Sequence, residues 1–293
     1  MIFNKFFILF KIGRKIGKSN IINIVSETHK IPVFIKLFFN LLAFSFSSSN
    51  DTKSKGKENL SESIQEMGTT FIKLGQFLAT RPDIIGEKLS KELESLQDKL
   101  PPFSKNEAEK IIIENLGQSN FDDIIDLSEP IAAASIAQVH KAKIKEDNII
   151  KNVAIKVLRP NIKKIFNDEI DAIMLLAYIT ESLITKTKRL KLIEVVFLFK
   201  EITNHEMDLR FEAAAANEYA ENTKNDLGFF VPKIYWNFTS ESVLTLDWVD
   251  GVSIREKDLL KEKNIETSKI ATNLIQHFLR HAVRDGFFHA DMH

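Results

Sequence analysis

The sequence predicts an α+β fold, and three observations support this prediction. Apolar residues recur at helical spacing over residues 60–100. The period changes at residues 153–158, where side chains alternate as they do in a β-strand. Helical spacing then returns twice, with further strand-like segments between. Strands, two helices, strands and then helices form an order that is typical of α+β proteins.

Composition indicates a globular protein. The chain has 293 residues, of which 44% are hydrophobic, enough for one large or two ordinary domains with a real core. It contains no cysteine, which excludes disulfides and thiolate metal sites and agrees with a reducing compartment.

The first 50 residues are basic, apolar and aromatic. They hold seven Lys or Arg and one acid, Glu27, so this segment is +6 and the remainder of the neutral chain is −6. Its apolar runs, residues 3–10 and 33–46, are interrupted by lysines, whereas a spanning helix needs about 20 apolar residues. We therefore expect residues 1–50 to lie in the membrane interface, drawn to anionic lipid. The alternative is that these helices pack against the protein's own body.

The next elements follow from turn residues and capping. Residues 45–57 are rich in Ser and Lys and predict a linker. Pro82 is expected to break residues 60–100 into two helices. A further helix over residues 105–116 is expected to end at Gly117.

The second half alternates between strand and helix patterns. A charged turn at 145–148 predicts a β-hairpin, because alternating segments flank it. The other predicted elements are helices at 161–184 and 191–222, strands at 231–238 and 242–249, and a helix at 267–285.

Lys156 is the first candidate functional residue. It points away from the apolar face of its strand, where a lysine is usually just solvated. Glu212 lies in an alanine-rich helical run, residues 210–215, whose small side chains allow close approach to neighbours. A strand lysine held by a helix glutamate is the ion pair that orients phosphates in kinase-type phosphoryl transfer.

An alanine-rich run precedes the lysine strand, where a kinase carries its glycine-rich loop. Small side chains leave backbone free over phosphates, although alanine resists the positive φ that glycine adopts. The alternative is the start of a packed helix. The candidate ATP-binding residues, besides Lys156, are Ile131, Ala132, Ala133, Ala134, Ser135, Ile136, Ala137, Gln138 and Val139.

Histidines near the end of the chain allow two interpretations. In a kinase loop, Asp291 would accept the proton of the attacking hydroxyl and His289 would support the loop. With His293, these residues could instead begin a metal site. His277 and His281 lack the glutamate of a zinc-protease helix, and we expect them to be ordinary helix residues.

From about Leu60 to His293 the chain resembles the UbiB family, the atypical protein-kinase-like proteins of ubiquinone biosynthesis. The resemblance rests on the order of the residues above together with the specific segments 70–76 (TFIKLGQ) and 80–83 (TRPD). It implies a protein-kinase-like fold with an N-terminal helical extension. It also implies that Lys73 and Gln76 occupy the place of a peptide substrate.

The resemblance further implies that Lys73 and Gln76 face the acidic residues Glu206 and Asp208. This arrangement would suppress the phosphorylation of other proteins. Lys156, Glu212 and Asp291 are then the catalytic residues, and residues 244–249 supply the hinge that reads adenine. The implied organisation is a membrane-interfacial segment at 1–50, a helical extension at 57–125, a kinase-like N-lobe at 126–250 and the start of a C-lobe at 251–293.

Two departures from the family pattern affect the expected activity. Met292 stands where the family usually has proline, which leaves the loop less constrained. The sequence ends at His293, so the Asn and Asp that would hold Mg²⁺ are expected beyond it. We therefore expect an incomplete C-lobe, an inactive fragment and, in the full-length protein, a C-terminal hydrophobic anchor.

The resemblance implies two functions. The first is a kinase or ATPase that uses ATP and Mg²⁺ to support ubiquinone biosynthesis, bound peripherally through its N-terminus to the cytoplasmic face of the inner membrane. The second is a non-catalytic, nucleotide-gated chaperone or scaffold for quinone precursors. Expected partners are membrane lipids and ubiquinone precursors or biosynthetic enzymes, and no nucleic acid. The residues do not support a polyprenylphenol hydroxylase, because the sequence shows no flavin fingerprint and no evident iron triad.

Overall fold

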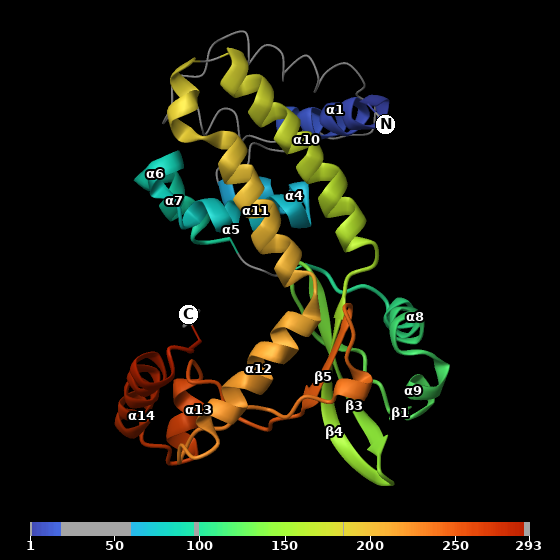
Figure 1. Cartoon of the computed structure of the whole chain (residues 1–293). Helices are drawn as coiled ribbons and strands as arrows, with labels where there is room; N and C mark the ends of the chain where they lie inside the picture. The colour runs from blue at the N-terminus through green and yellow to red at the C-terminus, as the bar shows by residue number, and fades with distance from the viewer. Residues whose placement is uncertain (1, 19–59, 97–99, 184, 290–293) are drawn as a thin grey trace. The chain divides into compact units, whose positions relative to one another are not determined.

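The computed structural model describes residues 2–18, 60–96, 100–183 and 185–289 (Figure 1). The chain forms two compact units, which we describe separately. The helical unit comprises residues 1–101, 133–137 and 159–207, and the sheet unit comprises residues 102–132, 138–158 and 208–293. The helical unit thus includes residues 159–207, which the sequence assigned to the N-lobe; the predicted lobe boundaries stay predictions.

The helical unit is built from short helices and two long ones. Its helices are α1 (Ile2–Lys18), α4 (Leu60–Met67), α5 (Thr69–Ala79), α6 (Pro82–Ile85), α7 (Glu87–Leu93), α10 (Ile162–Leu183), a 3₁₀ turn (Thr185–Leu190) and α11 (Leu192–Glu206). The predicted break at Pro82 is confirmed. Two further breaks, at Gly68 (φ 105°) and Gly86 (φ 83°), divide residues 60–93 into four helices, because glycine adopts positive φ at little cost.

The core of the helical unit lies between α1, α5, α10 and α11. The long helices α10 and α11 run side by side (Figure 1), and α5 contacts both. Phe199 of α11 lies edge-on to Phe166 and 5.5 Å from Phe77, measured between ring centroids. Ile12 of α1 is buried against Met67. None of the helices in the described part of the chain is long and apolar enough to cross a membrane.

The sheet has the order β1-β3-β4-β5, and β2 pairs with β3. Its strands are β1 (Ile124–Ile125), β2 (Pro130–Ala133), β3 (Ala137–Glu146), β4 (Ile149–Leu158) and β5 (Val243–Asp247). The predicted β3–β4 hairpin is confirmed. Asp147 and Asn148 form its two-residue turn with φ of 51° and 61°, the left-handed geometry that such hairpins require.

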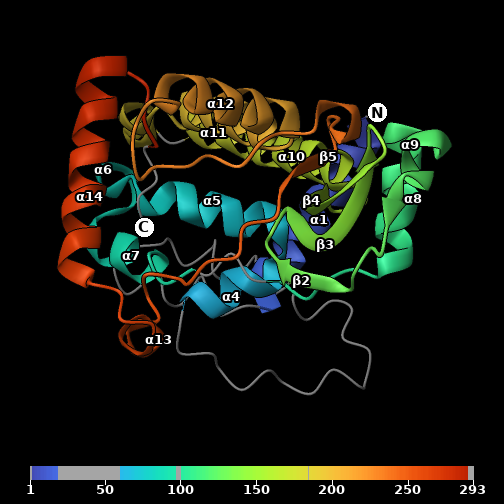
Figure 2. The same cartoon turned by 90° about the horizontal axis from the view of Figure 1, so that it is seen from below.

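Helices cover the two faces of this sheet. One face packs against α8 (Lys105–Leu116), whose Ile112 joins a cluster with Ile155 and Val157. Beyond Gly117, α9 (Gln118–Asp122) continues the chain, and the predicted end of α8 is confirmed. The long helix α12 (Leu209–Thr223) contacts β5 and lies on the other side of the sheet (Figure 1 and Figure 2).

Two predictions of secondary structure are wrong. Residues 231–238 do not form a strand: Ile234 makes an isolated bridge, and a 3₁₀ turn follows at Trp236–Phe238. Two backbone bonds, from Tyr235 N to Thr245 O and from Asp247 N to Lys233 O, flank that bridge, and pairing with β5 stops where the 3₁₀ turn begins. The single helix predicted at 191–222 is two helices, because the Asp208 side chain accepts a bond from Arg210 N and caps α12.

The end of the described chain is helical, as predicted. It contains α13 (Lys257–Glu262) and α14 (Thr267–Arg280). A π-helical turn at His281–Asp285 continues α14, so the predicted helix at 267–285 is confirmed with a change of winding near its end.

Candidate functional site

The predicted ion pair between β4 and α12 is present. Lys156 Nζ lies 2.7 Å from Glu212 Oε2, within the sheet unit. Glu212 lies in the first turn of α12, where the helix dipole stabilises a negative charge. The two side chains are 27% and 50% exposed, so solvent and a ligand can reach both groups. The pairing is confirmed, while its role in catalysis stays a prediction.

The N-terminus of α12 is held firmly against β5. Leu209 and Ala213 are fully buried, and Leu209 N donates a hydrogen bond to Glu241 O at 3.0 Å. Ala213 has only a methyl group, which agrees with the expectation that alanine permits close approach. The rigid helix start therefore fixes the backbone that carries Glu212.

The alanine-rich run, residues 131–139, forms a hairpin: its ends belong to β2 and β3, and residues 134–136 form the turn. Ala134 N donates to Ala137 O at 2.8 Å, so the alternative of a helix start is wrong. Arg159 donates to Ala134 O through Nε and Nη2, and the Thr69 hydroxyl donates to Ser135 O at 3.2 Å. These contacts, all within the helical unit, hold the backbone of the turn in place.

The side chains of this run differ in accessibility. Ile131 is exposed, whereas Ser135 and Gln138 are buried. The Gln138 amide bonds the backbone of Phe103 and the ring of His140. The Gln138 side chain therefore stabilises the fold. Only the backbone of Gln138 is available to contact a nucleotide.

Lys73, in the family segment on α5, pairs with the predicted acidic residue Glu206. Lys73 Nζ lies 3.0 Å from Glu206 Oε2, inside the helical unit. A side chain at Gly75 would require the end of the Leu96 side chain to move, because an added Cβ would collide with it. Gln76 is half-buried, and Asp208 pairs with Arg210 at 2.7 Å. The proposed inhibitory role of these residues stays a prediction.

The predicted proton acceptor, Asp291, lies outside the described residues, as does His293. His289 is the last residue described and is exposed. The predicted hinge residues 244–249 begin at the second residue of β5 and extend two residues past its end, and Lys156 lies opposite Leu244 in the β4–β5 register.

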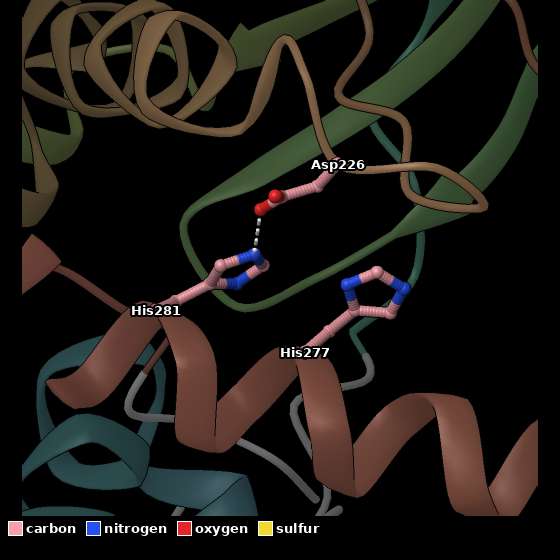
Figure 3. Close-up of side chains that lie close together, drawn as sticks. All are labelled: Asp226, His277 and His281. Atoms are coloured by element: carbon pink, nitrogen blue, oxygen red, sulfur yellow. Dashed lines mark hydrogen bonds and ion pairs between the residues drawn. The ribbon is translucent and has the colours of Figure 1, made fainter. Parts of the chain in front are cut away.

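Sequence reasoning missed a cluster around Asp226. The structure brings Asp226 together with His277 and His281, which were expected to be ordinary helix residues (Figure 3). The spacing of the two histidines was visible in the sequence. Their contact with a carboxylate about 50 residues earlier depends on tertiary packing, for which the sequence gives no local pattern.

Comparison with known proteins identifies the family. Residues 95–293 match the family described as ABC1 atypical kinase-like domain. A protein of Marinobacter nauticus named "Probable protein kinase UbiB" is 34% identical over 265 residues, which cover 90% of this chain and 48% of that protein. One of the same name from Pseudomonas aeruginosa is 30% identical and covers 97% of this chain and 53% of its own length. The chain thus spans about half the length of these relatives.

A solved structure, described as the complex of Rv3197 with erythromycin from Mycobacterium tuberculosis, is 25% identical and covers 63% of this chain and 44% of that one. Its TM-score is 0.38, so the fold assignment rests on the family match and on the helices and antiparallel sheet described above. The chain belongs to the ABC1 atypical kinase-like family and, within it, to the UbiB group.

Proposed function

We propose that this chain carries the nucleotide-binding part of an atypical kinase or ATPase that supports ubiquinone biosynthesis. The observation that carries the proposal is the 2.7 Å ion pair between Lys156 and Glu212. The names of the relatives, probable protein kinases, agree with this assignment. The link to ubiquinone comes from membership of the UbiB group.

In this proposal, Glu212 positions the Lys156 ammonium group, which offers a positive charge and hydrogen bonds to the α and β phosphates of ATP. The residues fit such a ligand because the pair is part-exposed and anchored on a strand and a helix start. The backbone of the alanine-rich turn is the proposed cover of the phosphates. Mg²⁺ would neutralise phosphate charge. Asp291 is the proposed proton acceptor.

The test replaces Lys156 with alanine and measures equilibrium binding of ATP to the complete protein. Loss of one charged hydrogen bond costs about 1.5–3 kcal/mol, so affinity should fall roughly tenfold to a hundredfold. Lys143→Ala is the matched control, because Lys143 belongs to the neighbouring strand and also forms an ion pair, with Asp126 at 2.7 Å. Unchanged ATP affinity in a folded Lys156→Ala variant would overturn the assignment.

A second candidate function, a carrier or scaffold for quinone precursors, is favoured by exposed apolar side chains on the two long helices. They are Leu176, Tyr178 and Ile179 on α10, and Phe197, Leu198 and Ile202 on α11. Such surfaces suit a lipid-like ligand better than water. Binding of a phenolic precursor that survives replacement of both Lys156 and Asp291 would favour this function over the first.

We also propose that the protein binds membranes peripherally at their cytoplasmic face, through its first 46 residues. Residues 19–46 lie outside the described residues. In α1, Ile12 is buried against the protein's own body, whereas Phe7 is 67% exposed and Phe10 is 38% exposed. The alternative that these helices pack on the protein therefore holds for one face of α1, and the other face is available to lipid.

The exposed Phe7 allows a sharper test than deletion of the segment, which would also remove the packing of Ile12. Phe7→Ser should weaken co-sedimentation with anionic liposomes and leave thermal stability nearly unchanged, because this side chain is 67% exposed. Salt should weaken binding further, because charges are screened beyond about 8 Å at physiological ionic strength. Equal binding of parent and variant at low salt would contradict the proposal.

A further inference from the structure

Three potential metal ligands converge in the sheet unit, outside the candidate nucleotide site. Asp226 lies in the loop after α12, His277 in α14, and His281 at the start of the π-helical turn. One ligand atom from each lies within 4.8 Å of the others (Figure 3). The three residues are 9%, 8% and 0% exposed. Single π turns inside helices often occur at functional sites.

His277 carries a buried polar atom without a partner. Its Nδ1 makes no hydrogen bond in the described structure. Figure 3 shows a ring nitrogen of His277 facing the pair formed by Asp226 and His281. An unsatisfied buried nitrogen carries a desolvation cost, and its lone pair is the group that a metal ion binds.

His281 is oriented as a metal ligand usually is. Its Nε2 lies 2.9 Å from Asp226 Oδ2, and its Nδ1 lies 2.7 Å from the Tyr219 hydroxyl. Metal-binding histidines use their second nitrogen in such a hydrogen bond, which fixes the ring and its tautomer. Tyr219 therefore serves as a positioning residue for His281.

Two arginines hold the Asp226 carboxylate in place. Arg284 donates to both oxygens of Asp226, at 2.8 and 2.9 Å, and Arg280 lies 3.4 Å from Oδ1. The Arg284 guanidinium holds the pKa of the Asp226 carboxyl well below its ordinary value, so the carboxylate is ionised.

The charge of the arginines opposes a cation, but a second carboxylate offsets it. Asp285 accepts two hydrogen bonds from Arg284, at 2.6 and 2.7 Å. The two arginines and two aspartates of this group sum to zero, so an ion entering it would not meet a net positive charge. The bond from His281 to Oδ2 is the contact that the ion would replace.

We propose that Asp226, His277 and His281 form a binding site for a divalent transition-metal ion of the zinc type. Two imidazoles and one carboxylate form a common ligand set for zinc, with a water molecule in the fourth position. Mg²⁺ prefers oxygen ligands and is a poor fit. The ion takes the place of the hydrogen on His281 Nε2, and the neutral ring then carries its proton on Nδ1, which faces the Tyr219 hydroxyl. It joins α14 to the loop after α12, whether or not the chain binds nucleotide.

His277→Phe tests the site with little risk to the fold. Nδ1 has no hydrogen bond to lose, and phenylalanine keeps a ring in the same space. Zn²⁺ binding is followed by calorimetry, and Co²⁺ binding by the visible absorption of tetrahedral Co²⁺. We expect one ion per chain in the parent and a rise in melting temperature on adding Zn²⁺. Both should be lost in His277→Phe.

Two further variants separate this site from adventitious binding. Tyr219→Phe removes only the bond that orients His281, so zinc affinity should fall about tenfold to a hundredfold. His205→Gln removes an exposed histidine on α11 and should leave affinity as in the parent. If His277→Phe binds Zn²⁺ as the parent does, or if the parent binds none, the proposal is overturned and the cluster is a hydrogen-bonded support only.

Discussion

The two faces of the sheet show how the fold and the proposed chemistry are divided. On the face toward α8, Val153, Ile155 and Val157 of β4 are fully buried. On the opposite face of the same strand, Lys156 is 27% exposed and paired with Glu212. Alternation along one strand thus supplies a rigid support on one side and an accessible charge on the other.

Polar groups on the buried face are satisfied by one another. Gln138 accepts a bond from Phe103 N at 2.9 Å and donates to His140 Nε2 at 2.9 Å. His140 must then carry its proton on Nδ1, which donates to Ser128 O at 2.8 Å. By contrast, a part-exposed pair such as Lys156–Glu212 contributes only about 0–1 kcal/mol to stability. The position of that pair is better explained by ligand binding than by folding.

The largest expected effect is on the buried face. Ile155→Ala should lower the free energy of unfolding by about 2–5 kcal/mol, because it opens a cavity in the cluster beneath α8. Lys156→Ala, one residue further along β4, should change it by no more than about 1 kcal/mol. Urea unfolding of both variants measures the contrast. Similar losses in the two would show that the faces do not differ as described.

A smaller effect is expected on the stability of the protein at acidic pH. Burial lowers the pKa of the His140 ring below its ordinary value of 6.5. Below pH 6.5 the unfolded chain therefore binds a proton that the folded chain excludes, and stability falls with falling pH by up to about 1.4 kcal/mol per unit. His140→Leu should unfold more easily at neutral pH yet show a shallower dependence down to about pH 5. Identical slopes would mean that His140 is not excluded from protonation.

Local patterns predicted most of the fold. The β3–β4 hairpin and the end of α8 followed from alternation, turn residues and Gly117, all of which act over a few residues. The strand expected at 231–238 is reduced to a single bridge at Ile234, because a 3₁₀ turn begins at Trp236. The break before α12 was missed because Asp208 was not identified as an N-cap. Its side chain accepts a hydrogen bond from Arg210 N and starts a new helix there.

The two candidate sites also differ in how far the sequence predicts them. The pairing of Lys156 with Glu212 was predictable because strand alternation and an alanine-rich helix each gave a local pattern, and the family resemblance joined them. Asp226 and His281 meet across 55 residues through packing of α14 against the loop after α12. No spacing in the sequence describes that contact.

A double-mutant cycle on Lys156 and Glu212 tests the central claim most directly. ATP affinity and unfolding free energy are measured for the parent, Lys156→Ala, Glu212→Ala and the double variant. Because Glu212 acts through Lys156, its removal should weaken ATP binding in the parent but have no further effect once Lys156 is gone, while stability changes by no more than about 1 kcal/mol throughout. ATP affinity that is the same in all four folded proteins would contradict the account.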